Sequence, residues 1–252
     1  IRVIAPDVGG AIGRKLYLYA EEVITAMVAK HLGRPVKWIE QRQEGYLATT
    51  HGRDHLSAAT IMGNRDGTIT GLSCTTYSNM GAYLSTFAPL IPTYLYGLMF
   101  VGPYDFPNVL CKVIAPFTNT TPVDAYRGAG RPEATYLIER MVDLFAAKIG
   151  MDPAEVRRKN FIPPFKDGYD VPTGVTYDSG DFEQALDKAL EMADYSALRD
   201  EQEKARSNGK YIGIGLASYV EICGGAPSSV ATTLGARAGL WESSLVRMHP
   251  TG

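Results

Sequence analysis

Apolar residues recur every three or four positions in two long segments, which predicts two amphipathic helices. The first covers residues 20–32 and ends at Gly33. The second begins near Pro132 and Glu133 and ends at Gly150. Proline suits the first helical position, where its missing N–H would be unpaired anyway, and glutamate suits the positive end of the helix dipole. Both helices therefore have sequence signals at their ends.

Runs of apolar and β-branched residues predict strands, and one pair is joined by a turn signal. Asp66 and Gly67 lie between two of these runs, a pattern typical of a β-hairpin. A hairpin makes neighbouring strands antiparallel, so the sheet cannot be purely doubly wound. The predicted strands are residues 1–5, 35–39, 54–62, 69–82, 108–117 and 211–221, with a further one near 246–249.

The most apolar window, residues 87–101, is interrupted by prolines and a glycine. It is too short for the ~20 residues of a membrane span and indicates a buried loop or a short helix. Prolines and glycines make 161–180 a loop or linker that ends the first half of the chain. Asp181 and Gln184 resemble a capping box for the next helix. A charged surface helix is expected at about 195–207.

Composition excludes several classes of function. The 252 residues carry 25 Lys and Arg against 27 Asp and Glu, a formal net charge of −2. This balance disfavours binding to the phosphate backbone of nucleic acids. Cys74, Cys111 and Cys223 are far apart and form no C-x-x-C pair, which argues against a metal knuckle or a disulfide framework. We expect buried thiols in a reducing compartment, the cytoplasm.

Both ends of the sequence resemble the interior of a domain. Ile1 opens inside a predicted strand, and the last residues look like a strand that runs into a turn. We therefore expect a fragment of a longer protein, without a signal or transit peptide.

Two glycine-rich turns precede predicted helices and are flanked by cations. The first covers residues 9–15 and contains Arg14 and Lys15; the second covers 127–133 and lies between Arg127 and Arg131. Exposed N–H groups and a positive helix end attract anions, and glycine lets a ligand approach the backbone closely. The pair of turns indicates an extended anionic cofactor.

Other motifs are weaker. Glu40 follows Gly13 by 27 residues (40 − 13 = 27), and with the G-G-x-x-G spacing this only partly imitates a dinucleotide-binding fingerprint. His51 and His55 have the spacing of a helical zinc pair but lack the glutamate between them. Glu221 is either a buried functional carboxylate or a strand-end acid in an ion pair. No G-x-S-x-G nucleophile motif occurs.

These residues carry a resemblance to a known family. The segment Asp7–Lys15 resembles the V-G-G-G-F-G-x-K segment of molybdenum hydroxylases, the xanthine dehydrogenase, aldehyde oxidase and carbon monoxide dehydrogenase family. The segment Ala125–Ala134 resembles the second cofactor segment of that family. Three further similar segments follow in the same order, so the resemblance covers essentially the whole chain: Arg157–Ile162, Tyr177–Gly180 and His249–Gly252.

The resemblance implies a central piece of the large, molybdenum-binding subunit with an α+β fold of mixed sheets and packed helices. Residues 1–165 would form a first molybdopterin-binding subdomain, and 166–252 the start of a second. It implies molybdopterin, in its cytosine dinucleotide form, and Fe–S and FAD groups on partner subunits or domains. A dimer of heterotrimers that hydroxylates a small organic substrate with water is implied too.

The site residues are carried over by position. No catalytic residue is expected in this chain, because the family's glutamate base lies beyond residue 252, and no residue binds the metal directly. The implied cofactor-binding residues are Gly9, Gly10, Ala11, Ile12, Gly13, Arg127, Gly128 and Ala129. The implied substrate pocket consists of Ile12, Tyr126, Ala129, Tyr219 and Glu221.

Departures from the family pattern narrow the substrate. Ala11 and Ile12 replace a glycine and a phenylalanine, Leu16 replaces the acid of purine hydroxylases, and Ala129 replaces their stacking aromatic residue. Gly128 stands where copper-type carbon monoxide dehydrogenases have a cysteine. An aldehyde or similar small organic substrate is expected. Two alternatives stay open: an inactive structural or partner-binding fragment, and a carbon monoxide dehydrogenase-like subunit without the copper cysteine.

Overall fold

The computed structural model describes residues 2–222, 232 and 245–249. By its internal contacts the chain divides into two units, Ile1–Tyr219 and Val220–Gly252. The elements below belong to the first unit. In the second unit, residues 245–249 have no regular structure, so the strand predicted there is wrong for the part described, and Cys223 lies outside the described residues. The boundary at 165/166 concerns domains of the complete fold and stays a prediction.

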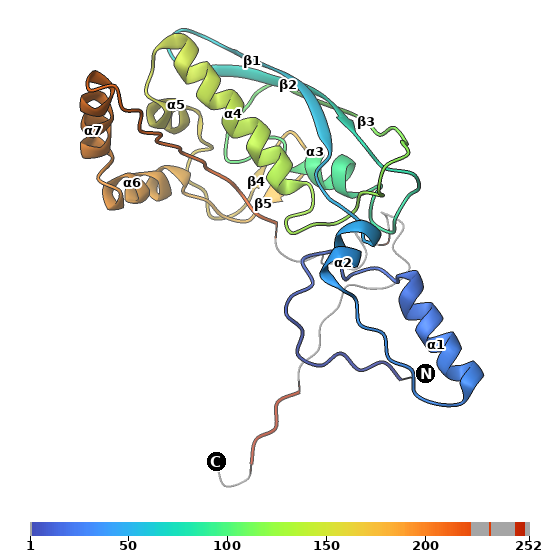
Figure 1. The fold of residues 1–252 in the computed structure, drawn as a ribbon. Helices are drawn as coiled ribbons and strands as arrows, with labels where there is room; N and C mark the ends of the chain where they lie inside the picture. The colour runs from blue at the N-terminus through green and yellow to red at the C-terminus, as the bar shows by residue number, and fades with distance from the viewer. Residues whose placement is uncertain (1, 223–231, 233–244, 250–252) are drawn as a thin grey trace. The chain divides into compact units, whose positions relative to one another are not determined.

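The first unit contains a three-stranded mixed sheet (Figure 1). Strand β1 (His55–Gly63) pairs antiparallel with β2 (Ile69–Ser78), which pairs parallel with β3 (Val109–Ile114). The turn between β1 and β2 is closed by Asp66, whose carboxylate accepts the Thr68 N–H at 2.9 Å. The predicted hairpin, the strand near 108–117 and the α+β class are confirmed.

Helix α4 (Arg131–Ile149) packs against β1 and supplies much of the core. Its buried residues follow the predicted apolar face, and Gly150 ends it in the left-handed region at φ 70°. At Gly63 the strand and the helix approach so closely that a Cβ would lie 2.6 Å from Phe145. The buried apolar residues of α4 are Ala134, Leu137, Ile138, Val142, Phe145 and Ala146.

The apolar window at 87–101 contains a π-helix, Ile91–Leu95, and the short helix α3, Tyr96–Leu98. Tyr96, Phe100 and Val101 are at most 1% exposed. The expectation of a buried loop or short helix is therefore confirmed.

After α4, the described part of the first unit contains three more helices and a small strand pair. Helices α6 (Phe182–Met192) and α7 (Tyr195–Ser207) confirm the predictions, and the Asp181 side chain accepts the Gln184 N–H at 3.0 Å. The sequence reading missed α5 (Pro153–Asn160) and the pair β4–β5 within the predicted loop (Tyr169–Asp170 and Thr176–Tyr177).

The N-terminal segment differs most from the predictions. Helix α1 (Ala20–Leu32) ends at Gly33 as expected, and α2 (Arg42–Ala48) was not predicted. Residues 2–5, 35–39 and 211–221 form no strands, which corrects three predictions. A strand needs a neighbouring strand that exchanges backbone hydrogen bonds with it, and no described segment pairs with these three in that way.

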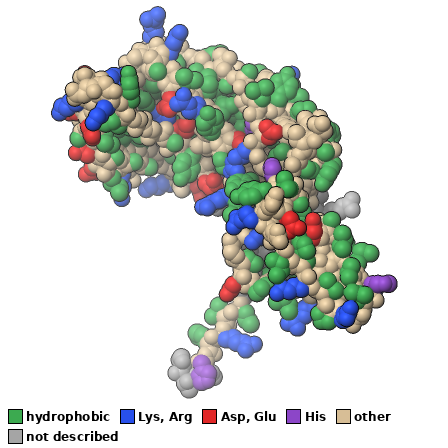
Figure 2. Space-filling view, in the orientation of Figure 1, with side chains coloured by type: hydrophobic (Ala, Val, Ile, Leu, Met, Phe, Trp, Pro, Cys, Tyr) green, Lys and Arg blue, Asp and Glu red, His purple; other side chains and the backbone are tan. Residues whose placement is uncertain are grey.

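The apolar face of α1 is exposed, so this helix has none of the burial that its pattern predicts. No residue of α1 is buried, and Ile24 and Met27 are 57% and 65% exposed. Figure 2 shows hydrophobic side chains on the surface over this segment. Among the described residues, no helix is both long and apolar enough to cross a membrane.

Candidate functional site

The first glycine-rich turn presents bare backbone. Gly10, Ile12 and Gly13 have φ values of 92°, 58° and 97°, whereas Ala11 is not among the residues with positive φ. The sign of φ thus alternates from Gly10 to Ile12, a feature of backbone turns that bind anions in a nest of N–H groups. Within the described part of the chain, none of the N–H groups of residues 9–13 donates to an acceptor. A Cβ on Gly9 would meet no atom within 4 Å, so a ligand can reach the backbone there.

The second turn is tightly wound and leads into α4. Gly128, Ala129 and Gly130 all have positive φ, at 98°, 49° and 90°. The Ala129 N–H donates to the Tyr126 carbonyl at 2.7 Å. A Cβ on Gly128 would lie 2.3 Å from the Pro132 ring, so only glycine fits this position without rearrangement.

The two turns lie against each other although they are far apart in sequence. The Arg127 N–H donates to the Ile12 carbonyl at 2.9 Å. A Cβ on Gly13 would lie 2.3 Å from the Ala125 carbonyl oxygen, so glycine is needed where the turns touch. The structure thus joins both predicted cofactor segments into one surface.

Two buried residues that the sequence reading missed support the second turn. Asp124 is 1% exposed, and its carboxylate accepts the Phe87 N–H at 3.0 Å and the Ala125 N–H at 2.6 Å. The Tyr17 oxygen accepts the same Ala125 N–H at 2.8 Å. Burial, followed by the neighbouring Asp124, raises the pKa of Tyr17 well above its usual range, so this phenol stays neutral.

Backbone strain is concentrated at this surface. In the described chain, non-glycine residues with positive φ are Ile12, Arg53, Ala129 and Asp194. Ile12 and Ala129 lie in the two turns, and Arg53 contacts the second turn through a hydrogen bond to the Arg127 carbonyl. A β-branched residue such as isoleucine is an outlier at φ 58°. Such strain persists where surrounding contacts enforce it, and it is typical of functional sites.

The charges beside the first turn argue against a dinucleotide fingerprint. Arg14 forms an ion pair and a short hydrogen bond with Glu40, the acid that such a fingerprint would place on a ribose. The preceding residues, 35–39, do not form the required strand. Lys15 and Arg127 are exposed cations, one in each turn. The dinucleotide reading is not supported, whereas the open N–H groups and cations fit an anionic ligand.

Of the predicted substrate-pocket residues, the structure brings three together. Ile12 and Tyr126 are 48% and 46% exposed and lie at the contact between the turns with Ala129. Tyr219 is 66% exposed. Among the described residues, it makes no hydrogen bond or ring contact with either turn. Glu221 lies in the second unit and is exposed there, so the assignments of Tyr219 and Glu221 stay predictions.

His51 and His55 do not lie on a helix. His51 pairs with Val123 in an isolated bridge, and its ring nitrogen is 3.1 Å from the Tyr46 carbonyl. His55 begins β1, and its ring packs edge-on against Tyr96 with centroids 5.4 Å apart. The helical geometry of a zinc pair is therefore missing at these two residues.

A model of the molybdopterin cofactor-binding domain matches residues 1–161, which includes both turns. The chain belongs to this family, the molybdopterin-binding domain of molybdenum hydroxylase large subunits. It is 39% identical to the carbon monoxide dehydrogenase large chain of Hydrogenophaga pseudoflava over all of this chain and 32% of that protein. It is 30% identical to human aldehyde oxidase over 97% of this chain and 18% of that protein.

Solved structures agree. Quinoline 2-oxidoreductase from Pseudomonas putida 86 matches with a TM-score of 0.84 and 32% identity, covering 90% of this chain and 29% of that one. A Cu,Mo-containing CO dehydrogenase matches with a TM-score of 0.80 and 33% identity over the same shares. This chain therefore spans less than a third of the length of these relatives.

Proposed function

We propose that the complete protein containing this chain is a molybdenum-dependent hydroxylase that oxidises an aldehyde or similar small organic substrate. Water supplies the oxygen, and the electrons pass to Fe–S and FAD groups. The observation that carries the proposal is the contact between the two turns, made by the Arg127 N–H and the Ile12 carbonyl at 2.9 Å. That contact turns two separate anion-type segments into one continuous surface.

The residues of this surface fit molybdopterin. The open N–H groups of residues 9–13 can donate hydrogen bonds to an anionic ligand, and the space beside Gly9 lets that ligand approach the backbone closely. Arg127 is the exposed cation of the second turn, and Gly128 and Ala129 continue that turn with φ values of 98° and 49°. The contact between the two turns makes one surface, which supports an extended anionic ligand such as the cytosine dinucleotide form of the cofactor. When bound, the cofactor supplies the metal centre at which the substrate is oxidised.

The cofactor-facing residues of this chain bind and orient, and they offer no acid or base of their own. Ile12 and Ala129 place aliphatic side chains at the contact between the turns, and Leu16 is 56% exposed close by in sequence. None of these side chains hydrogen-bonds a purine, which supports a less polar organic substrate. We propose, from the resemblance to the family, that the glutamate base lies beyond residue 252.

A carbon monoxide dehydrogenase-like subunit is favoured by one observation, the 39% identity to such a large chain. The turn itself disfavours a copper-type site, because a side chain on Gly128 would meet Pro132 at 2.3 Å in this conformation. We therefore keep, as the second candidate, a carbon monoxide dehydrogenase-like subunit that lacks the copper cysteine.

We further propose Fe–S and FAD partner subunits, a dimer of heterotrimers, and a cytoplasmic location. Among the relatives are one named a large chain and one named subunit gamma of the 6-hydroxypseudooxynicotine dehydrogenase complex, which supports a multi-subunit assembly. Cys74 and Cys111 are free, which supports a reducing compartment. A subdomain boundary at 165/166 is supported by the end of the matching family model at residue 161.

The test uses the complete protein purified with its partners. Molybdenum and a pterin nucleotide, each near one per large subunit, are the expected result, together with dye-linked aldehyde oxidation. Active enzyme that contains neither would refute the proposal. The alternative is that this chain by itself is an inactive structural or partner-binding module. It predicts no aldehyde oxidation by the isolated chain, so turnover by that chain would exclude it.

A further inference from the structure

Arg53 contacts the entry of the second cofactor turn in two ways. Its guanidinium donates a short hydrogen bond to the Arg127 carbonyl. Its Cζ atom also lies 4.9 Å from the centre of the Tyr126 ring, within the range of a cation–π contact. One side chain thus fixes both the backbone and the neighbouring ring where the turn begins.

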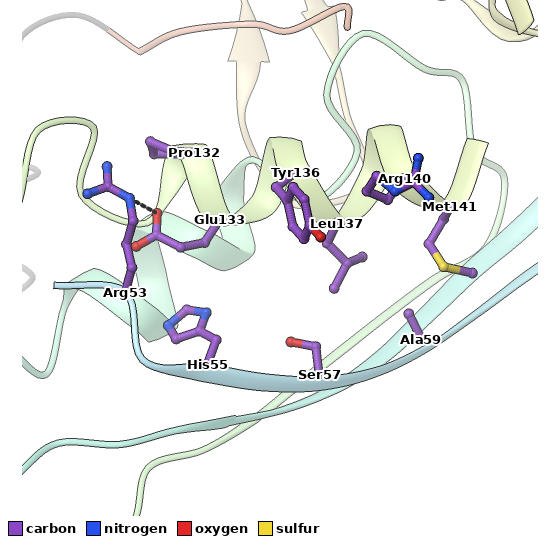
Figure 3. Close-up of a pocket in the computed structure, with 10 residues that line it drawn as sticks. All are labelled: Arg53, His55, Ser57, Ala59, Pro132, Glu133, Tyr136, Leu137, Arg140 and Met141. Carbon is purple, nitrogen blue, oxygen red and sulfur yellow. Dashed lines mark ion pairs between the residues drawn. The ribbon is translucent and has the colours of Figure 1, made fainter. Parts of the chain in front are cut away.

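The same guanidinium reaches the exit of the turn. Its Nε lies 3.9 Å from Oε2 of Glu133, in the first turn of α4. Figure 3 shows the two side chains pointing toward each other at one end of a pocket of about 720 Å³ between β1 and α4. The Glu133 side chain is only 9% exposed, and its Oε2 has no hydrogen-bond partner among the residues that the structure describes. Arg53 is therefore the counter-charge to a buried carboxylate.

The backbone of Arg53 is itself strained, with φ at 57°. Gly52, just before it, is close enough to the second turn that a Cβ would lie 2.6 Å from the Tyr126 Cβ. Side chain and backbone of this segment are thus both fitted to the turn. Positive φ at a non-glycine residue is strained and persists only where surrounding contacts enforce it, so the contacts of Arg53 with the second turn account for this conformation.

We propose that Arg53 is a positioning residue, which fixes the conformation of residues 126–130 by joining their entry at Tyr126 and Arg127 to their exit at Glu133. The inference rests on the proposed function only in that these residues face the cofactor. A planar guanidinium can lie over a ring, donate to a backbone carbonyl and pair with a carboxylate at the same time, and a lysine ammonium cannot do all three. The role therefore requires arginine and not merely a positive charge.

The test compares three variants of the complete protein with its partners. Arg53→Lys keeps the charge beside Glu133 and loses the fork. The double variant Arg53→Gln/Glu133→Gln removes both charges together. Arg140→Gln is the matched control, because Arg140 lines the same pocket but is paired only with Asp143, at 3.4 Å, among the described residues.

Two measurements are made on each variant. One is the molybdenum and pterin content of the purified complex. The other is the rate of trypsin cleavage after Arg127 in protein produced without molybdate, which reports the order of the turn when no cofactor is bound. The thermal midpoint is recorded alongside.

We expect both R53K and the double variant to lose cofactor and to be cut after Arg127 about tenfold faster, the scale expected for loss of a hydrogen bond from a charged group. Both should keep a thermal midpoint close to that of the unsubstituted protein, and R140Q should match that protein throughout. Should R53K not yield folded complex, Tyr126→Leu, which removes only the stacked ring, carries the same expectation.

Unchanged cofactor content and cleavage in R53K would overturn the proposal. Full recovery of both in the double variant would overturn it as well, since Arg53 would then act only as a counter-charge. If the unsubstituted protein contains no molybdopterin, the proposed function fails, and the trypsin rates still decide whether Arg53 orders the turn.

Discussion

Replacing Arg157 by methionine should destabilise the protein much more than the same change at Arg158, its neighbour in α5. Arg157 is 0% exposed, and its Nε and Nη2 donate to Oε2 of Glu139 at 2.9 and 2.8 Å. Its Nη2 also donates to Asp143 at 2.9 Å. The Arg158 side chain is 27% exposed, and its carboxylate partners are 51% to 59% exposed.

The magnitude follows from burial. Burial raises the pKa of Glu139 above its usual range, and Arg157 opposes this by favouring the charged form. Without Arg157 the carboxylate is left buried and uncompensated, which costs about 3–5 kcal/mol. Exposed ion pairs contribute about 0–1 kcal/mol each because water and salt screen them, so Arg158→Met, which removes three of them, should cost less than about 3 kcal/mol.

Hydrogen exchange locates the effect. The Ser218 N–H donates to Glu139 Oε2 at 2.9 Å, and the Leu216 carbonyl accepts from Arg157 Nη2 at 2.9 Å. In R157M the amide of Ser218 should exchange about a hundredfold to a few thousandfold faster, since about 1.4 kcal/mol corresponds to a factor of ten. R158M should leave it unchanged. Equal exchange in both variants, or a cost below 1 kcal/mol in R157M, would refute the reasoning.

Two further predictions concern the site. Gly13→Ala should lower cofactor content and reduce stability by about 1–3 kcal/mol, because φ is 97° and the new Cβ would lie 2.3 Å from the Ala125 oxygen; Gly97→Ala, which meets no atom within 4 Å, is the control, and equal cofactor content in the two would contradict it. Burial lowers the pKa of His55, against the opposing charges of Glu133 and Asp54. The unfolded chain therefore binds a proton first, so the free energy of unfolding should fall as pH drops below about 6.5, by at most about 1.4 kcal/mol per pH unit. Denaturant titrations at several pH values from about 7.5 to 5 give the free energy of unfolding at each pH. This free energy should fall less with decreasing pH in His55→Gln, and an unchanged pH dependence would exclude His55 as its source.

The elements that the sequence predicted correctly depend on local chemistry. The Asp66–Gly67 turn signal specifies the hairpin of β1 and β2, and the helical period together with Gly150 specifies α4. Capping by Asp181 marks the start of α6 in the same way. Each of these signals lies within a few residues of the structure that it determines.

The strands predicted at 2–5, 35–39 and 211–221 are wrong because a strand is not a local structure. Apolar and β-branched residues favour an extended backbone, but a strand exists only when a neighbour accepts and donates its hydrogen bonds. Ile4 and Ile39 are each 69% exposed, and no described segment pairs with theirs. The apolar pattern indicates that these residues favour burial, but the described part of the chain does not bury them in a sheet.

The candidate site also combines local features, which the sequence predicts, with a tertiary contact, which it does not. Its two glycine turns are visible in the sequence, because glycine and adjacent cations have local meaning. Their contact is not, because the Arg127 N–H and the Ile12 carbonyl meet only after the chain has folded. Positive φ at Ile12 and Ala129 contradicts local preference outright, so neither conformation could be predicted from residue type. Tertiary contacts must enforce them, and Arg53 is one of the described side chains that reach across to the second turn. Under our proposal, the conformation of that turn depends on a residue that no local motif of the sequence singled out.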